Sequence, residues 1–459
     1  MSIQNSEFKI QNYSSEYRSL FKLGLPVMAT QVGIILVAFA DTSMVGAYGV
    51  DQLAAAAFVN SIFMIPTVMQ IGFASGITPL IGALFGRKDL DGVGCTLRAG
   101  LQTNSFLSIG LTAVMAVLYF FLGDFGQPEE LLPLIREYYL IILASLFPMA
   151  IFNCSQQTAN AMTDTASPMW IILSANAVNI LGNYLLIFGK FGCPELGLNG
   201  AGISTLVARW LSVFGVLYVF GFTRRYRPYM KGALGASRVG NIRRKVWSIS
   251  WPMMVQSGFE VALWSLGAVV CGWFGKIQLA AYQVINTISQ LGFMIFLSFG
   301  VAVSIRTSNF TGVGDAVGIR RATIAGIHLN MVLATIASVG FFVFGPHLVE
   351  FFTPDHDVIE SARMLIIPLV LYQYGDAAQL TFANSVRGMG NPRPFLWVAL
   401  IAYLLIGVPA LFALACGLDL GNVGVYYSFS FALFSAALIL YLSYRRTLRT
   451  LPKASTKIL

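Results

Sequence analysis

Long uninterrupted apolar stretches constrain this chain more than any other feature of its sequence. Clear examples are residues 106–122 and 395–416. About 20 helical residues are needed to cross roughly 30 Å of hydrocarbon. Only α-helices and closed β-barrels satisfy their backbone polar groups there, and barrel strands would alternate in polarity. We therefore predict an all-α integral membrane protein.

Twelve such stretches can be placed along the 459 residues. Composition agrees, because only 11% of the residues are charged, against about a quarter in soluble domains. The predicted transmembrane helices cover residues 20–45, 53–75, 97–122, 134–157, 167–189, 200–221, 247–273, 279–304, 320–345, 360–384, 395–416 and 422–443.

The net charge of +9 describes topology and not nucleic-acid binding. On a twelve-helix map the basic clusters fall on one side of the membrane, and the largest of them lies in residues 222–246. The connections on the opposite side are mostly acidic. Basic loops stay in the cytoplasm, so we expect a multi-pass protein with both termini cytoplasmic.

The two halves of the chain repeat one another. Residues 26–89 align without gaps on 252–315, an offset of 226, with QLAA at 52–55 recurring at 278–281. A duplicated unit of six helices crosses the membrane twice in the same direction, which makes a parallel repeat. We predict two pseudosymmetric six-helix lobes around a central cleft, an arrangement suited to transport by alternating access.

This repeat divides the chain into five predicted parts. These are a cytoplasmic N-terminal segment (1–19), an N-lobe (20–221), a cytoplasmic basic linker (222–246), a C-lobe (247–443) and a cytoplasmic basic tail (444–459).

Acidic residues inside the predicted spans indicate function, because a charge at the bilayer centre costs about 2.5–3.5 kcal/mol. Two of them, Glu260 and Asp376, lie in the C-lobe with polar residues at helical spacing. These polar stripes should face one another or water. The predicted cation- and drug-binding residues of this lobe are Glu260, Asp376, Gln256, Gln283, Asn286, Tyr372 and Gln379.

Such a pocket has two possible uses. Low dielectric disfavours a charged carboxylate, so it can take up a proton; alternatively, it stays ionised and holds Na⁺ or a cationic drug beside aromatic faces. Competition between drug and cation for one carboxylate is antiport. A buried acid that only bonds its neighbours is the alternative.

The third intramembrane acid, Asp41, lies in the first helix. On the fifth helix Asn176, Asn179 and Asn183 share one face, and Thr205 of the sixth can join them. A carboxylate with amides and a hydroxyl supplies oxygen ligands for a hard monovalent cation such as Na⁺. Asparagines also hold helices together, and spacing does not separate the two roles.

Other site chemistries find little support in the sequence. The three histidines have no ligand spacing, the five cysteines have no paired spacing, and no nucleotide cradle is present. We therefore expect no ATP use, no enzymatic activity, no cofactor beyond a coupling cation, and no metal site beyond Na⁺ at Asp41 or at the C-lobe acids.

Several short motifs, in this order and at these helix positions, give a resemblance over about residues 16–445. The chain resembles the multidrug and toxic compound extrusion (MATE) transporters, and more narrowly their NorM-like bacterial branch. The motifs are GLP at 24–26, ADTSMVG at 40–46, FEV at 259–261, QLAA at 278–281, YQYGD at 372–376 and RGMG at 387–390.

The resemblance implies a V-shaped fold in the bacterial cytoplasmic (inner) membrane, and efflux of cationic, amphipathic drugs coupled to Na⁺ or H⁺. Glu260 and Asp376 match the family's second-lobe acids, and Asp41 matches its first-lobe acid. Asn179, Asn183 and Thr205 match its first-lobe cation site, although some members carry aspartate where Asn183 stands. The expected partners are drugs or toxins, the coupling cation and the lipid bilayer, and we expect a monomer.

Two other functions remain to be weighed. A lipid-linked oligosaccharide or lipid flippase of the same superfamily shares the architecture, but such proteins tend to line the cleft with arginines. A membrane-embedded enzyme would need a His/Ser/Asp or metal cluster near one interface, which the sequence does not offer.

Overall fold

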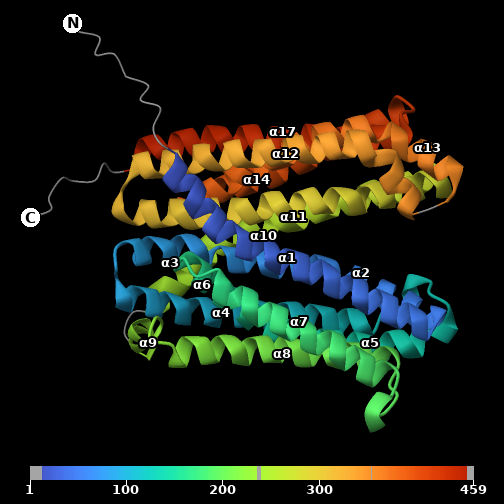
Figure 1. Cartoon of the computed structure of the whole chain (residues 1–459), viewed down its shortest axis with the longest axis horizontal. Helices are drawn as coiled ribbons and strands as arrows, with labels where there is room; N and C mark the ends of the chain where they lie inside the picture. Colours follow the sequence, from blue (N-terminus) through green and yellow to red (C-terminus); the bar gives the residue numbers. More distant parts are fainter. Residues whose placement is uncertain (1–12, 235–238, 353, 452–459) are drawn as a thin grey trace, which may run out of the picture.

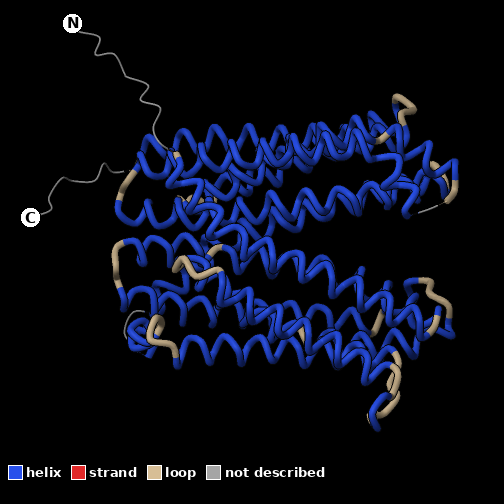
Figure 2. The backbone as a smooth tube through the Cα atoms, in the orientation of Figure 1, coloured by secondary structure: helices blue, strands red, loops and turns tan. Residues whose placement is uncertain are grey.

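The computed structural model describes residues 13–234, 239–352 and 354–451, and within these ranges the chain is helical with no strand (Figure 2). The first half contains α1 (Ser14–Tyr48), α2 (Val50–Ser75), α3 (Ile77–Gly86), α4 (Leu90–Tyr119), α5 (Leu132–Ala144), α6 (Leu146–Ala161), α7 (Ala166–Ile187), α8 (Leu198–Phe222) and α9 (Arg227–Leu234). Short 3₁₀ turns lie at Leu122–Phe125, Glu129–Leu131 and Lys190–Gly192.

The second half begins with four long helices and a short one. They are α10 (Val239–Trp273), α11 (Lys276–Val313), α12 (Ala316–Phe352), α13 (His356–Met364) and α14 (Ile366–Gly388). One further span consists of α15 (Arg393–Trp397), a π-helical stretch η4 (Val398–Gly407), α16 (Val408–Phe412) and a second π-helical stretch η5 (Ala413–Gly417). The last helix is α17 (Gly421–Thr450).

The predicted all-α membrane fold is confirmed. In the described ranges, 11 helical segments are long and apolar enough to span a bilayer. Each corresponds to one predicted span, and the predicted span 360–384 corresponds to the remaining segment, α13–α14. Tyr372, Gln373, Asp376 and Gln379 make α14 too polar to count as apolar, although it lies inside the bundle.

The internal repeat is visible in local structure. Asp89 caps the start of α4 by accepting from the Gly92 amide at 2.8 Å. Asp315, 226 residues later, accepts from the Gly318 amide at 2.8 Å at the start of α12. An acidic N-cap satisfies a free amide and favours the positive end of the helix, so both units begin their third span in the same way.

The two halves form two bundles that spread apart toward one end (Figure 1), which is the V shape that the resemblance implied. Their first helices cross over: α1 packs against α11 and α12, and α10 packs against α2 and α4. Because α10 is the repeat equivalent of α1, these contacts are related by the pseudosymmetry. We call α1–α8 the N-lobe and α10–α17 the C-lobe.

Small residues allow the lobes to approach closely near the end where α3 lies. A Cβ atom added at Gly72 would lie 2.7 Å from Ser257 Oγ and 3.1 Å from its Cβ. Gly76 faces Ser250, and Gly82 faces Ser308, in the same way. Without a large hydrophobic driving force in lipid, small residues provide the close packing between membrane helices.

The predicted linker and termini are partly outside the described residues. Within 222–246 the structure places α9 and the start of α10, while 235–238 lie outside the described part. Residues 1–12 of the predicted N-terminal segment and 452–459 of the predicted tail also lie outside it. The described parts of these two segments, at Ser14 and Thr450, lie at the same end of the bundle (Figure 1).

Cysteines at positions 72 and 257 are expected to form a disulfide between the lobes. In a background without the five native cysteines, Gly72→Cys and Ser257→Cys place two sulfurs within reach of each other. A protease site engineered into 222–246 then cuts the chain in two. We expect one full-length band on a denaturing gel until a reductant separates the halves.

Each single-cysteine variant, cut in the same way, is the control and should give two bands with or without reductant. Two bands from the double variant under oxidising conditions would show that α2 and α10 do not meet as described.

Candidate functional site

The first site lies in the N-lobe, where α1, α7 and α8 bring four predicted residues together. Asn183 donates from its amide nitrogen to Oδ1 of Asp41. In the amide orientation that satisfies both of its ends, Asn179 donates to the same oxygen at 2.9 Å and accepts from Thr205 Oγ1 at 3.3 Å. Asn179 and Asn183 can both reach Asp41 because residues four apart on α7 share one helix face.

Polar oxygens remain unused around Asp41. The side-chain oxygen of Asn183 is buried without a described partner. Asp41 itself is only partly buried, and its Oδ2 makes no described hydrogen bond. Carboxylate and amide oxygens are the ligands that hard cations prefer, so the arrangement has the capacity to bind a cation.

Asp41 and Thr205 line a cavity of about 540 Å³ in this lobe. Apolar side chains such as Phe63, Met64 and Ile142 form part of its wall, and Asn60, Tyr138 and Arg209 add polar groups. A mostly apolar cavity with a few converging polar groups is the usual form of a small-molecule site.

The fifth predicted residue of this lobe, Asn176, lies elsewhere. It is two helical turns from Asn183, and its amide nitrogen is 3.2 Å from where a Cβ of Gly33 on α1 would stand. That nitrogen is buried without a described partner. Asn176 therefore packs between α7 and α1, away from the carboxylate of Asp41.

The second site lies in the C-lobe, where a chain of hydrogen bonds connects three helices. Gln256 donates to Glu260 at 2.8 Å and also to the hydroxyl of Tyr403 at 3.3 Å. Gln379 of α14 donates to the same hydroxyl at 3.2 Å. Tyr403 thus connects the Glu260 helix to the Asp376 helix.

Asp376 has no partner of its own. Its side chain is fully buried, and neither carboxylate oxygen makes a described hydrogen bond. Glu260 is close enough to interact with it electrostatically, and one oxygen of Glu260 is also buried without a partner. No described ion pair involves either acid.

Aromatic rings form one wall beside these acids. Tyr372, one turn before Asp376, contacts Trp264 edge-on with ring centroids 5.6 Å apart. Trp264 also stacks on Phe429 at 6.1 Å, and Tyr426 lies 6.2 Å from Tyr372. Such faces attract cations.

The remaining two predicted C-lobe residues lie on α11 and are not fully buried. Gln283 on α11 is exposed, and Asn286 is partly buried. Within the described residues, no hydrogen bond joins either side chain to Glu260 or Asp376.

Three residues of these sites escaped the sequence reasoning. Tyr403 is the only polar side chain in its π-helical stretch, and that isolation was a usable signal. Arg387 acts electrostatically on Glu260, whereas sequence reasoning placed it only in the RGMG motif at 387–390. Arg209 lies inside the predicted span 200–221, where a charge is as costly as the acids.

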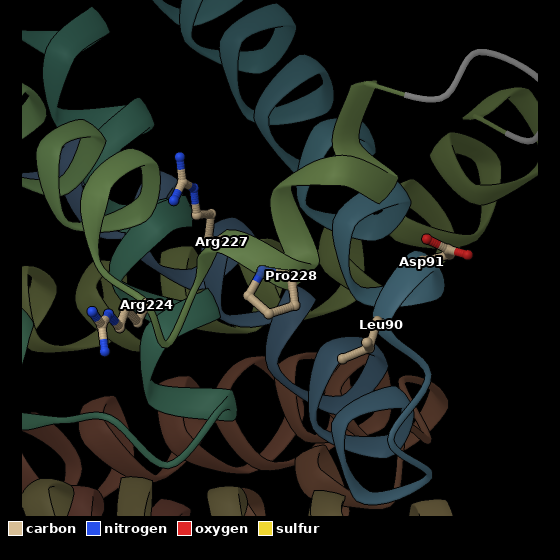
Figure 3. A pocket seen from close by; sticks show the side chains of 5 residues that line it. All are labelled: Leu90, Asp91, Arg224, Arg227 and Pro228. Carbon is tan, nitrogen blue, oxygen red and sulfur yellow. The ribbon is translucent and has the colours of Figure 1, made fainter.

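A second, shallower pocket of about 460 Å³ lies at the surface beside the starts of α4 and α9. Figure 3 shows Arg224 and Arg227 on one side of it and Asp91 on the other. None of the predicted site residues lines it.

Comparison with known proteins decides the family. The sequence profile of the MatE family matches residues 26–185 and 252–412, which is more than half of the chain. The two matches begin 226 residues apart, the offset of the internal repeat. The chain belongs to the MatE family. It is a MATE transporter and not an enzyme.

Relatives and solved structures agree with this assignment. The chain is 26% identical to the probable multidrug resistance protein NorM of Bradyrhizobium diazoefficiens, over 96% of each chain. It is 27% identical to the multidrug resistance protein NorM of Photobacterium profundum, over 87% of this chain and 88% of that protein. These relatives confirm the predicted NorM-like resemblance.

The fold of this MATE transporter matches solved structures of the family. An outward-facing multidrug resistance MATE transporter superimposes with a TM-score of 0.85 at 18% identity, covering 95% of this chain and 96% of that one. A eukaryotic MATE transporter gives 0.84 at 21% identity, covering 96% and 100%. At these identities the likeness concerns the fold.

The hydroxyl of Tyr403 is expected to stabilise the C-lobe. Tyr403→Phe leaves the buried amide of Gln379 without its hydrogen-bond partner, which costs about 1–3 kcal/mol. We expect a lower melting temperature of the purified protein in detergent. Tyr426→Phe is the matched control, because that hydroxyl has no described partner, and it should melt like the unsubstituted protein. Equal melting temperatures for the two variants would contradict the hydrogen-bond chain.

Proposed function

We propose that this chain exports cationic, amphipathic compounds across the bacterial cytoplasmic membrane in exchange for Na⁺ or H⁺, by alternating access. The observation that carries the proposal is the unpaired carboxylate of Asp376. It is buried among helices beside a second acid. In the described part of the chain no arginine forms an ion pair with either acid, although Arg387 acts on Glu260 electrostatically.

In the C-lobe, two neighbouring carboxylates favour the uptake of positive charge. Two buried negative charges repel each other and lose their hydration, so one of them is neutral or a cation lies between them. A proton, Na⁺ or the positive end of a drug each meets this requirement. Since only one of them is needed at a time, binding of the drug releases the coupling cation.

The aromatic wall selects the drug class. Tyr372 and Trp264 contact each other one helical turn from Asp376, and aromatic rings next to a carboxylate suit a molecule that carries a delocalised positive charge. Apolar side chains in the rest of the lobe core exclude water and favour an amphipathic molecule over a fully polar one.

In the N-lobe, the oxygens around Asp41 suit the coupling cation. Asp41, the side-chain oxygen of Asn183 and the hydroxyl of Thr205 supply hard oxygen ligands. Because the chain carries asparagine at position 183, a single positive charge balances Asp41. Na⁺ and H⁺ both fulfil this condition.

Alternating access uses the division into two lobes. The lobes touch through small residues at one end, near Gly72 and Gly76, and spread apart at the other (Figure 1). Rocking of one pseudosymmetric unit on the other exposes a fixed site to each side in turn. An even number of spans and the basic tail support a cytoplasmic position of both termini. One chain contains both sites, which supports a monomer.

Neutralising either C-lobe acid is expected to abolish drug resistance. Glu260→Gln and Asp376→Asn keep the side-chain volume but remove the negative charge. Drug and coupling cation replace each other at that charge. An efflux-deficient host that produces either variant should become as sensitive to cationic drugs as the empty host, with unchanged amounts of protein in the membrane.

Glu360→Gln is the matched control, because this acid is exposed on α13 and pairs with Arg363 there. It should retain full resistance. Unchanged resistance in both Glu260→Gln and Asp376→Asn would exclude the exchange mechanism.

The coupling ion is identified by separate ion jumps. In everted vesicles loaded with a cationic dye, we expect efflux of the bound dye to respond to either a Na⁺ jump at constant pH or a pH jump without Na⁺. One pH unit supplies about 1.4 kcal/mol, and 100 mV adds about 2.3 kcal/mol per charge. Asp41→Asn should reduce the rate of dye efflux after a jump in the active ion about tenfold or more. This factor corresponds to the free energy of one hydrogen bond or ligand contact to a charged group. A full response in this variant would remove Asp41 from coupling.

A further inference from the structure

The surface pocket of Figure 3 lies outside both proposed sites, at the end of the bundle where both described termini lie (Figure 1). The span that contains α4 begins at Leu90, and the span of α8 ends at Phe222. The pocket therefore lies where two membrane spans reach the headgroup layer, and not within the hydrocarbon. Its lining residues come from the start of α4 and from the segment between α8 and α9: Leu90, Asp91, Arg224, Arg227 and Pro228.

Aromatic side chains on α8 support this depth. Tyr218 and Phe222 are 64% and 77% exposed, and their rings stack with centroids 5.3 Å apart. Tyrosine collects at the headgroup level of membranes, and an exposed apolar ring on a spanning helix faces acyl chains. The boundary between hydrocarbon and headgroups therefore lies close to Arg224, two residues after Phe222.

The helix that forms one wall of the pocket lies across the ends of the spans. In Figure 1, α9 is seen nearly along its axis, whereas α4 and α8 run across the view. Tyr229 and Met230 pack against the buried core of the N-lobe, while Arg227 and Pro228 are exposed. An amphipathic helix in the plane of the interface places its basic residues among lipid headgroups.

The pocket has a fixed shape because α9 is held tightly against α4. A Cβ atom added at Gly232 would lie 2.7 Å from Cα of Asp91, and one added at Gly94 would meet the carbonyl oxygen of Tyr229. Just before α9, the buried hydroxyl of Tyr226 donates to Asp164 at 2.7 Å. Backbones that approach this closely keep the two walls of the pocket in register.

The protein itself does not use the charged groups of the pocket. Arg225 donates to the carbonyl oxygen of Met162 at 2.9 Å. By contrast, within the described ranges no hydrogen bond or ion pair involves the side chains of Arg224, Arg227 or Asp91. Guanidinium groups match a phosphate, and a carboxylate matches an ammonium group.

We infer that this pocket binds the headgroup of phosphatidylethanolamine, with its phosphate at Arg224 and Arg227 and its primary ammonium at Asp91. This headgroup pairs with all three charged side chains. An anionic headgroup would leave Asp91 unpaired and would be repelled by it, and the quaternary ammonium of phosphatidylcholine has no N–H to donate to a carboxylate. Because α9 belongs to the segment that connects the lobes, the bound lipid ties that segment to the membrane surface.

Native mass spectrometry of the purified transporter tests the inference, because it resolves single lipid molecules bound to one protein. Delipidated protein is titrated separately with phosphatidylethanolamine, phosphatidylglycerol and phosphatidylcholine that carry identical acyl chains. For the first molecule bound, phosphatidylethanolamine should bind about tenfold or more tightly than phosphatidylcholine. This factor corresponds to the free energy of one hydrogen bond between charged groups. Phosphatidylglycerol should also bind more weakly than phosphatidylethanolamine.

Variants of the pocket separate its two kinds of contact. Arg224→Gln combined with Arg227→Gln should weaken the binding of phosphatidylethanolamine about tenfold or more, because the phosphate loses its charged donors. Asp91→Asn should also weaken it, but should strengthen the binding of phosphatidylglycerol by removing a repulsion. All three side chains are exposed, so the melting temperature without lipid should change little.

Arg243→Gln is the matched control. It removes an exposed positive charge near the start of α10 that does not line the pocket, and it should bind phosphatidylethanolamine as the unsubstituted protein does. An equally large loss in this variant and in the double arginine variant would show a diffuse basic surface in place of a pocket.

Three further outcomes would overturn the inference. In the first, the three lipids bind equally well. In the second, the double arginine variant keeps its affinity for phosphatidylethanolamine. In the third, phosphatidylglycerol binds more tightly than phosphatidylethanolamine, which would assign the pocket to an anionic lipid. All of these measurements concern lipid binding alone, so they leave the proposed efflux function to its own tests.

Discussion

The cost of placing carboxylates inside a membrane protein governs the rest of this structure. Asp376 is fully buried, and among the described residues neither its carboxylate oxygens nor one oxygen of the neighbouring Glu260 has a hydrogen-bond partner. Lipid cannot compensate such groups. The helices that carry them must therefore turn their polar stripes inward, and the surrounding amides and aromatic rings must fill the space. The low hydropathy of α14 is a direct result of this requirement.

The two lobes keep one frame but contain different chemistry. The acidic caps at Asp89 and Asp315 and the crossed packing of α1 and α10 are common to both. The acids are not common: the repeat partner of Asp41 is Gly267, which packs against Phe429. Where the N-lobe holds a mostly apolar cavity with a few polar groups, the C-lobe holds buried acids beside aromatic rings, so a duplicated scaffold came to hold two distinct sites.

Hydrogen bonding gives each lobe its own kind of site. In the N-lobe, amides from one helix face fix Asp41 at a single oxygen and leave the other open to a cavity. In the C-lobe, the hydroxyl of Tyr403 accepts from the amides of Gln256 and Gln379, while no donor in the described ranges reaches Asp376. An open oxygen on a cavity wall suits an incoming ligand, and a buried unpaired acid suits an exchange of cations.

The sequence alone determined the number of spans, the duplication and the positions of the three intramembrane acids. The length of an apolar stretch, the offset of the repeat and an acid within an apolar stretch can each be read from the order of the residues. Spacing also predicted that Asn179 and Asn183 share one helix face, and the family resemblance grouped them with Asp41 and Thr205. Only the tertiary structure decided which faces meet. It brought Tyr403, Arg387 and Arg209 to the acids, left Gln283 exposed and set Asn176 against α1. Helix rotation and crossing depend on packing between distant segments, which no local spacing contains.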